Sequence, residues 1–240
     1  MISKYNIKWH IPANIDYFIS TNQTGNSKGK YKHANFSKKV GDVDKIVDKN
    51  IIDLKDQLHL KHIAFMNQTH SNTILRVAGR DSYLDCDAIF TENRNIACAV
   101  LTADCIPILI TEKTGSIIGC IHAGWRGLKS QIIQKFFKHF STIPPHDFRV
   151  LLGPCISQNN YEVNDEIITN FLNYSKRLKK NTQGNYYMDL RHIAYDILNE
   201  LGITNVTMSG ACTYNDNFYS YRRDKITGRF ISLIWFKNDF

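Results

Sequence analysis

The sequence predicts a mixed α+β fold in a single domain that covers residues 1–240. Strand-like segments outnumber helix-like ones, and no repeat, low-complexity tract or Pro/Gly/Ser-rich linker divides the 240 residues. Apolar residues make up 43% of the chain and aromatic residues 12%, which is enough for a large core and argues against disorder.

The predicted strands are short segments rich in β-branched and aromatic residues. More of them occur than a plain alternation of strand and helix requires. Pro107 limits regular pairing near the start of the fifth segment. In chain order the predicted strands are 15–20, 62–68, 72–77, 96–102, 105–111, 116–122, 148–153, 205–210 and 229–236.

Three helices are predicted, over residues 125–140, 164–178 and 189–202. The first and third carry an apolar stripe at helical spacing. The second begins after Asn164, a good N-cap, with acidic residues in its first turn and basic residues at its end. The third stops at Gly202, a typical C-terminal residue.

The chain carries a net charge of +8, concentrated in the segments 28–39 and 175–180. Because no nucleic-acid motif accompanies this charge, we interpret it as a solvated surface and expect no nucleic-acid partner. The apolar runs are too short to span a bilayer, and the N-terminal stretch lacks the features of a secretory signal. These observations predict a soluble cytoplasmic protein with no membrane partner.

The six cysteines form no Cys-x-x-Cys pair, which excludes a zinc ribbon or a thioredoxin-type motif. In a chain of this length without a signal, we expect them to be reduced.

The stretch IHAGWRG (121–127) joins a predicted strand to a predicted helix. His122 ends the strand, and the backbone N–H groups of the helix start suit an anion. Arg126 adds a planar fork for a carboxylate or phosphate. Trp125 either stacks on a flat ring or wedges the helix against the sheet, and packing is the simpler interpretation.

Two further strand ends carry residues that can bind metal or substrate. Asp104, between two apolar strands, needs a cation or several N–H groups as partners. Cys105 beside it is by itself consistent with a small buried apolar residue. His70 follows the strand 62–68, so three strand ends deliver His70, Cys105 and His122. Two imidazoles and a thiolate suit zinc with an open fourth position, although only the fold can bring them together.

The C-terminal third adds candidates with less specific signals. Glu162 stands just before a predicted helix. Arg222 and Arg223 are expected on a strand, one on each face, so that one binds substrate while the other pairs with Asp224. A surface ladder of salt bridges explains the same pattern equally well.

Several motifs together resemble the YfiH family, also called laccase-domain or polyphenol oxidase proteins, purine nucleoside phosphorylases and peptidoglycan editing factors. The resemblance covers about residues 62–236, whereas the first 60 residues match only at Asn35 and 40–42. The matching motifs are QTH (68–70), TADCIP (102–107), HAGWRG (122–127), GPCI with YEV (153–163) and SYRRDKITGR (220–229).

The resemblance implies a four-layer α/β/β/α sandwich of mixed sheets. It implies zinc held by His70, Cys105 and His122, and copper as the alternative metal of the older laccase naming. The implied reactions are phosphorolysis of adenosine, inosine and methylthioadenosine, and deamination of adenosine. One departure concerns Asn22, which stands where the family has an arginine. This departure favours deamination over phosphorolysis.

The leading hypothesis is therefore a zinc enzyme that takes purine nucleosides and phosphate. We assign the catalytic roles to His70, Cys105, His122, Asp104 and Arg126. Arg126 is the candidate for phosphate binding, Asp104 and Glu162 are candidates for proton transfer, and the predicted substrate-binding residues are Gln68, Trp125, Glu162 and Arg222.

Three alternatives remain open. A cysteine hydrolase would use Cys105 as nucleophile and His122 or His70 as base, for example on peptidoglycan precursors. A copper oxidase is disfavoured, because the nine histidines include no His-x-His pair. A non-catalytic protein would bind nucleic acid or another protein through its basic surface.

Overall fold

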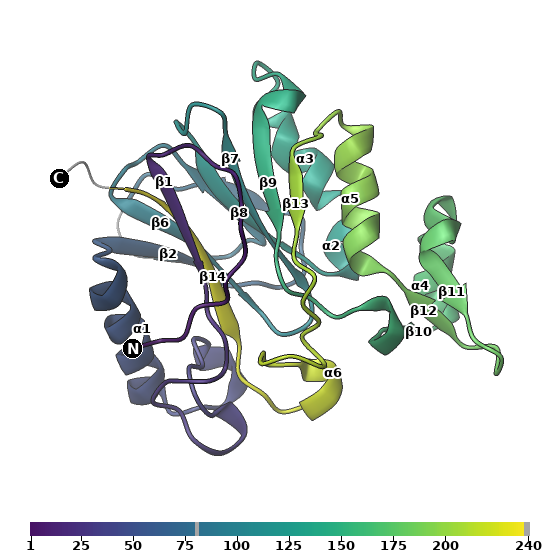
Figure 1. Cartoon of the computed structure of the whole chain (residues 1–240), viewed down its shortest axis with the longest axis horizontal. Coiled ribbons are helices and arrows are strands. Elements are labelled where there is room, and N and C mark those ends of the chain that lie inside the picture. Colours follow the sequence, from purple (N-terminus) through teal and green to yellow (C-terminus); the bar gives the residue numbers. More distant parts are fainter. Residues whose placement is uncertain (80–81, 238–240) are drawn as a thin grey trace.

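Two mixed sheets form the middle of the molecule in the computed structural model, which describes residues 1–79 and 82–237 (Figure 1). The five-stranded sheet has the order β1-β14-β6-β2-β4, in which β2 runs parallel to both β6 and β4 while the other pairs are antiparallel. Its strands are β1 (Ile15–Ile19), β2 (His62–Met66), β4 (Ser82–Leu84), β6 (Ile96–Thr102) and β14 (Phe230–Phe236).

The six-stranded sheet has the order β13-β9-β7-β8-β5-β3, with parallel pairs only at its two edges. Its strands are β3 (Ile74–Arg76), β5 (Ala88–Thr91), β7 (Ile106–Glu112), β8 (Ile118–Ala123), β9 (Phe148–Leu152) and β13 (Val206–Met208). The short connection from β6 to β7 carries the chain from one sheet to the other.

Helices cover the outer face of each sheet. The five-stranded sheet packs against α1 (Asp44–Leu58), and the six-stranded sheet against α2 (Trp125–Lys129), α3 (Ile132–Lys138) and α5 (Leu190–Glu200). A small antiparallel sheet and α4 project from one side of the body, at the right of Figure 1. They comprise β10 (Glu162–Val163), β11 (Leu178–Lys180), β12 (Tyr186–Met188) and α4 (Asp165–Thr169).

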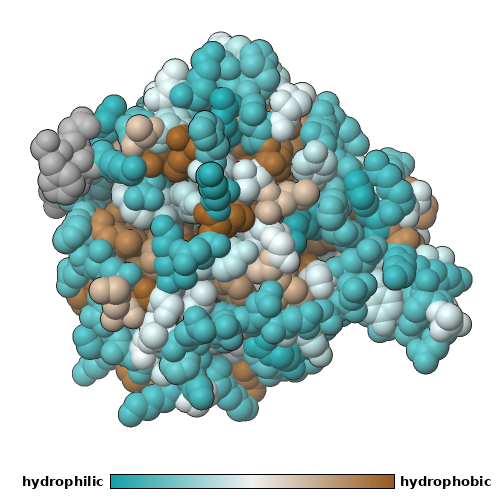
Figure 2. All heavy atoms as spheres, in the orientation of Figure 1, coloured by the Kyte–Doolittle hydropathy of each residue, from teal (hydrophilic) through white to brown (hydrophobic). Residues whose placement is uncertain are grey.

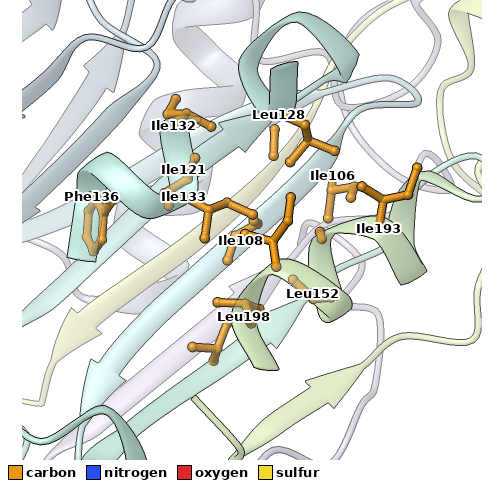
Figure 3. Packing of buried hydrophobic residues seen from close by; sticks show 14 of the residues in the cluster. Ile106, Ile108, Ile121, Leu128, Ile132, Ile133, Phe136, Leu152, Ile193 and Leu198 are labelled. Carbon is orange, nitrogen blue, oxygen red and sulfur yellow. The ribbon is translucent and has the colours of Figure 1, made fainter. Parts of the chain in front are cut away.

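Alternating side chains on the strands fill three apolar cores. In β7, Ile108 faces the helices while Leu109 faces the other sheet. In β6, Val100 faces the six-stranded sheet while Leu101 faces the layer of α1. Figure 3 shows the helix-side core, where strand residues such as Ile108 meet Ile133 of α3 and Leu198 of α5. This α/β/β/α arrangement confirms the predicted four layers.

Every predicted strand is present, with ends shifted by a few residues. The strands β4, β5, β10, β11 and β12 and the helix α1 were not predicted. Within α1 the buried side chains are few and include a polar one, Asn50, so the apolar stripe is weak. The remaining short helix, α6 (Tyr221–Asp224), lies at the foot of the view in Figure 1.

Three sequence predictions require correction. The helix predicted over 125–140 is broken into α2 and α3, because the Ser130 hydroxyl donates to the Arg126 carbonyl (2.6 Å) and Gln131 adopts a left-handed φ of 63°. The helix predicted over 164–178 ends at Thr169, although Asn164 caps it as expected. Arg222 and Arg223 belong to the helix α6 and not to a strand.

The surface shown in Figure 2 is mostly hydrophilic, including the projecting lobe of α4 and the small sheet. All six cysteines are free thiols. Among the described residues, no helix combines the length and the apolarity that crossing a bilayer requires.

Candidate functional site

A cavity of about 450 Å³ lies where the loop after β2, the β6–β7 connection and the end of β8 meet. Residues from both halves of the sequence line it. They are Ser37, Lys39, Val40, Met66, Gln68, His70, Leu101, Thr102, Ala103, Asp104, Cys105, His122, Trp125, Arg126, Ile156, Tyr161, Leu190, Tyr221, Arg222 and Arg229.

His70, Cys105 and His122 converge in this cavity, as the sequence predicted. Their ligand atoms all lie within 4.8 Å of one another. Sγ of Cys105 is 3.8 Å from Nε2 of His70, and the two imidazole rings meet edge to face with centroids 4.7 Å apart. Two imidazoles and one thiolate from three separate elements are a donor set that fits zinc and leaves a fourth position for water or substrate.

The backbone is strained at two of the segments that build this cluster. His70 has a φ of 62° and Asp104 a φ of 105°, both unusual for residues other than glycine. Such conformations persist where the surrounding structure holds them, and they gather at functional sites.

Asp87, which the sequence did not point to, contacts two of the three segments that carry the cluster. It is fully buried just before β5, and its Oδ1 lies 2.8 Å from Nδ1 of His122. The same carboxylate accepts backbone N–H bonds from Thr69 (3.1 Å), His70 (3.0 Å) and Ser71 (2.7 Å). It therefore directs Nε2 of His122 toward the cluster and shapes the loop that carries His70, the usual task of a carboxylate behind a metal-binding histidine.

The charged forms of Cys105, His122 and Asp87 stabilise one another. Burial alone would raise the pKa of the Cys105 thiol, but His122 and His70 lower it to about 6. Burial would lower the pKa of His122, yet Cys105 and Asp87 raise it to about 9. Burial would also raise the pKa of Asp87, whereas hydrogen bonds from His122 and Ser71 lower it to about 2. Cys105 is thus held as a thiolate, the form that binds a metal.

Gly124 explains the small residues of the IHAGWRG motif. A Cβ atom at this position would lie 2.8 Å from Sγ of Cys105 and 3.1 Å from Cδ2 of His70. Both contacts are shorter than normal packing allows, and neither ligand can retreat without disturbing the cluster.

We therefore expect Gly124→Ala to weaken metal binding by about tenfold or more, because the added methyl group displaces two ligands at once. Competition with a chromophoric chelator measures the affinity. Gly210→Ala is the matched control, since nothing lies within 4 Å of a Cβ atom there. An unchanged affinity in Gly124→Ala would contradict this packing.

The partners that Asp104 requires are provided by the C-terminal segment. Its Oδ1 accepts a hydrogen bond from the Thr213 hydroxyl (2.7 Å), and its Oδ2 accepts the backbone N–H of Arg222 (2.6 Å). Asp104 thereby ties the segment that contains α6 to the β6–β7 connection.

Other predicted residues lie in the cavity wall. The Gln68 side chain bridges to β6, donating to the Leu101 carbonyl (2.7 Å) and accepting its N–H (2.9 Å). The guanidinium of Arg126 stacks over Trp125 at 4.3 Å from the ring centroid, and Arg126 is exposed. Trp125 also packs against the helix-side core, which agrees with the packing interpretation.

The paired arginines lie on a helix and have different surroundings, and the expected pair of one of them with Asp224 is present. Arg223 pairs with Asp224 through Nε–Oδ1 (2.8 Å) and Nη2–Oδ2 (2.7 Å) contacts. Arg222 lines the cavity, lies over Tyr161 at 5.0 Å, and donates to the Glu162 carbonyl (2.9 Å).

The Glu162 carboxylate is not brought to the cluster. It is exposed and accepts from the Tyr187 hydroxyl (3.2 Å), outside the residues that line the cavity. Asn22 is also absent from the described lining, and its N–H donates to the Asn217 carbonyl (2.9 Å).

Tyr161, Lys39 and Arg229 line the cavity without having been predicted. Burial raises the pKa of Tyr161 well above its usual range, so its phenol stays neutral and can donate a hydrogen bond. Lys39 belongs to the basic segment 28–39, which we interpreted as solvated surface. The only sequence signal for Arg229 was its place in the SYRRDKITGR motif.

Solved structures share this arrangement. A Neisseria meningitidis protein superimposes with a TM-score of 0.89 at 33% identity, covering 96% of this chain and 98% of that one. YlmD from Geobacillus stearothermophilus also gives 0.89, at 25% identity and with 99% of each chain covered.

Sequence comparison agrees. A Haemophilus influenzae protein named purine nucleoside phosphorylase is 34% identical, over 97% of this chain and 98% of its own. The Escherichia coli K12 protein named purine nucleoside phosphorylase YfiH is 30% identical, over 95% of this chain and 96% of its own. Residues 16–237 match the family described as multi-copper polyphenol oxidoreductase laccase. The chain therefore belongs to this family, which confirms the resemblance to YfiH proteins that its motifs predicted.

Proposed function

We propose that this protein is a zinc-dependent enzyme that acts on purine nucleosides, by phosphorolysis and by deamination of adenosine. The observation that carries the proposal is the cluster of His70, Cys105 and His122, backed by Asp87, in the wall of a cavity. A volume of about 450 Å³ lies in the range of small-molecule sites. The names of the relatives supply the substrate class, a nucleoside.

Zinc bound to the three ligands would supply a Lewis acid and a water whose pKa is lowered toward 7. The chain's own residues do the remaining work. Asp87 keeps His122 in the tautomer that presents Nε2, and Asp104 holds Arg222 at the cavity. The neutral Tyr161 phenol, beside Arg222, is available to donate to a purine nitrogen or a ribose hydroxyl.

In phosphorolysis, a phosphate oxygen bonds to C1′ as the glycosidic bond breaks, and the departing purine takes up a proton. We expect this reaction to be retained despite Asn22. Position 22 is not among the residues that line the cavity, whereas the cationic side chains of Lys39, Arg126, Arg222 and Arg229 are.

The proposal is tested by incubating the protein with adenosine, with and without phosphate, and separating the products by chromatography. We expect adenine to form only when phosphate is present, and inosine to form in either case. No turnover by zinc-loaded protein would refute the proposed function.

A cysteine hydrolase, for example one that edits peptidoglycan precursors, is the second candidate, favoured by the lowered pKa of Cys105 beside His122. A copper laccase is disfavoured by the ligand count. Within residues 1–79 and 82–237, the cluster of His70, Cys105 and His122 is the one group of three or more metal-ligand side chains. We also propose a cytoplasmic setting, because all six thiols are free.

A further inference from the structure

Arg229 lines the cavity, and half of its guanidinium has no partner among the described residues. Nη1 donates to the carbonyls of Thr227 (3.1 Å) and Gly228 (2.9 Å). Nε and Nη2 have no hydrogen-bond or ion-pair partner among the described residues, although the side chain lines the cavity. The backbone is fixed, because its N–H donates to Oδ1 of Asn35 (2.9 Å) and its carbonyl accepts from Phe36 (3.1 Å).

A second polar group without a partner lies at the same end of the sheet. Thr102 also lines the cavity and is 1% exposed, and its hydroxyl has no hydrogen-bond partner among the described residues. Thr102 is the last residue of β6 and pairs with Phe230, the residue after Arg229. Buried hydroxyls and guanidinium groups are normally satisfied, so two exceptions that line the same cavity point to a ligand there.

Positive charge dominates this end of the cavity. Residues 35–36 hold the Arg229 backbone, and the chain continues from there to Ser37 and Lys39, which both line the cavity. The exposed Lys39 ammonium has no ion-pair partner in the described part of the chain. The carboxylate in the cavity wall, Asp104, is already engaged by Thr213 and by the Arg222 backbone.

We propose that Arg229, Thr102 and Lys39 form a subsite for a phosphate group. The open edge of the guanidinium offers two parallel N–H donors to two phosphate oxygens, the hydroxyl serves a third, and the ammonium supplies charge. The inference rests on the proposed nucleoside chemistry for its source, which is either orthophosphate as co-substrate or the 5′-phosphate of a nucleotide.

Arg126 and Arg222 are weaker choices for this role. Arg126 is exposed and stacked on Trp125, and α2 has only five residues, too short for a strong helix dipole. Arg222 also keeps Nε and Nη2 free among the described residues, but its guanidinium lies over the ring of Tyr161, whereas Arg229 adjoins Phe230, the strand partner of Thr102. Arg229 combines partial burial with free donors, which strengthens a hydrogen bond to an anion.

The test compares Thr102→Val with Ser232→Ala. Both remove a buried hydroxyl that lacks a partner, but Ser232 is not among the residues lining the cavity. With inosine as substrate, we expect Thr102→Val to raise the KM for phosphate several-fold while the KM for inosine and the melting temperature stay unchanged. Ser232→Ala should leave both KM values unchanged. Equal KM values for phosphate in Thr102→Val and the wild type would overturn the subsite.

Arg229 is tested by a graded pair. Arg229→Gln removes the charge and should raise the KM for phosphate by about tenfold or more, while Arg229→Lys restores the charge but not the fork and should recover part of the loss. If Arg126→Ala produces this change and the Arg229 variants do not, the assignment is wrong.

Phosphate binding is also measured without turnover, from the broadening of the ³¹P signal of inorganic phosphate. If the wild type shows no phosphorolysis, the proposed reaction fails, and this signal still decides the subsite. Broadening lost in Thr102→Val and Arg229→Gln supports it, and broadening equal to that of the wild type overturns it. A parallel arm with adenosine monophosphate identifies the source, because preference for the nucleotide over adenosine, lost in Arg229→Gln, assigns the 5′-phosphate.

Discussion

Replacing Asp87 with asparagine is expected to lower the metal affinity by about 10- to 100-fold and the free energy of unfolding by about 3 kcal/mol or more. The carboxylate accepts from Nδ1 of His122 and from three backbone N–H groups, and it is fully buried. An amide turns one oxygen into a donor that faces other donors. The ligands His122 and His70 then lose their fixed orientation.

Chelator competition and thermal melting, with and without metal, measure the two effects of Asp87→Asn. Asp85→Asn is the matched control, because Asp85 is exposed and its carboxylate accepts a hydrogen bond from Asn67 (2.9 Å) outside the cluster. If Asp87→Asn binds metal as tightly as Asp85→Asn, Asp87 does not position the ligands.

Removing the metal with a chelator is expected to make Cys105 the first cysteine to react with iodoacetamide. Its pKa of about 6 places it as the thiolate at neutral pH once no metal covers it. Because the thiolate forms above the pKa, the reaction rate should rise through pH 6 and level off above it. Burial raises the pKa of four other thiols, those of Cys86, Cys98, Cys120 and Cys155. Burial would also raise the pKa of Cys212, but hydrogen bonds from Ser157 and neighbouring N–H groups lower it; because Cys212 is only 6% exposed, we expect it to react after Cys105.

Peptide mass analysis locates the alkylated cysteine before and after chelation, and a Cys105→Ser variant identifies the background. The metal-loaded protein should be protected. Equal labelling of Cys105 in the two states would mean that this thiol binds no metal, and it would favour the cysteine hydrolase over the zinc enzyme.

The ligands were predictable because each is a distinctive residue type at the end of an apolar strand. The convergence of His70, Cys105 and His122 follows once the ends of their strands are expected to meet. Asp87 directly precedes a buried strand, but that strand, β5, was not predicted, so no strand end marked this residue. Only the fold shows that its carboxylate reaches His122.

The helix breaks were not predictable from periodicity. The stripe over 125–140 continues through Ser130 and Gln131 because the apolar residues on both sides keep the same face buried. The break depends on a hydroxyl bonding back to the Arg126 carbonyl and on one left-handed residue. Such local competition between side chain and backbone leaves no mark on an apolar pattern.

The basic residues of the cavity show a second limit of sequence reasoning. Lys39 lies in a charged segment whose composition is that of a solvated surface, and Arg229 lies far away near the C-terminus. The pairing of residues 35–36 with the Arg229 backbone brings them to one cavity. Composition alone cannot distinguish a lysine that lines a cavity from the solvated lysines beside it in the sequence.

The central claim is that His70, Cys105 and His122 hold one zinc ion, and elemental analysis of tag-free protein tests it most directly. The protein must be purified without contact with a chelator. We expect about one zinc per chain in the wild type and little in Cys105→Ala, with a fold unchanged by circular dichroism. Wild-type protein without metal, or a Cys105→Ala variant that retains the full zinc content, would contradict the account.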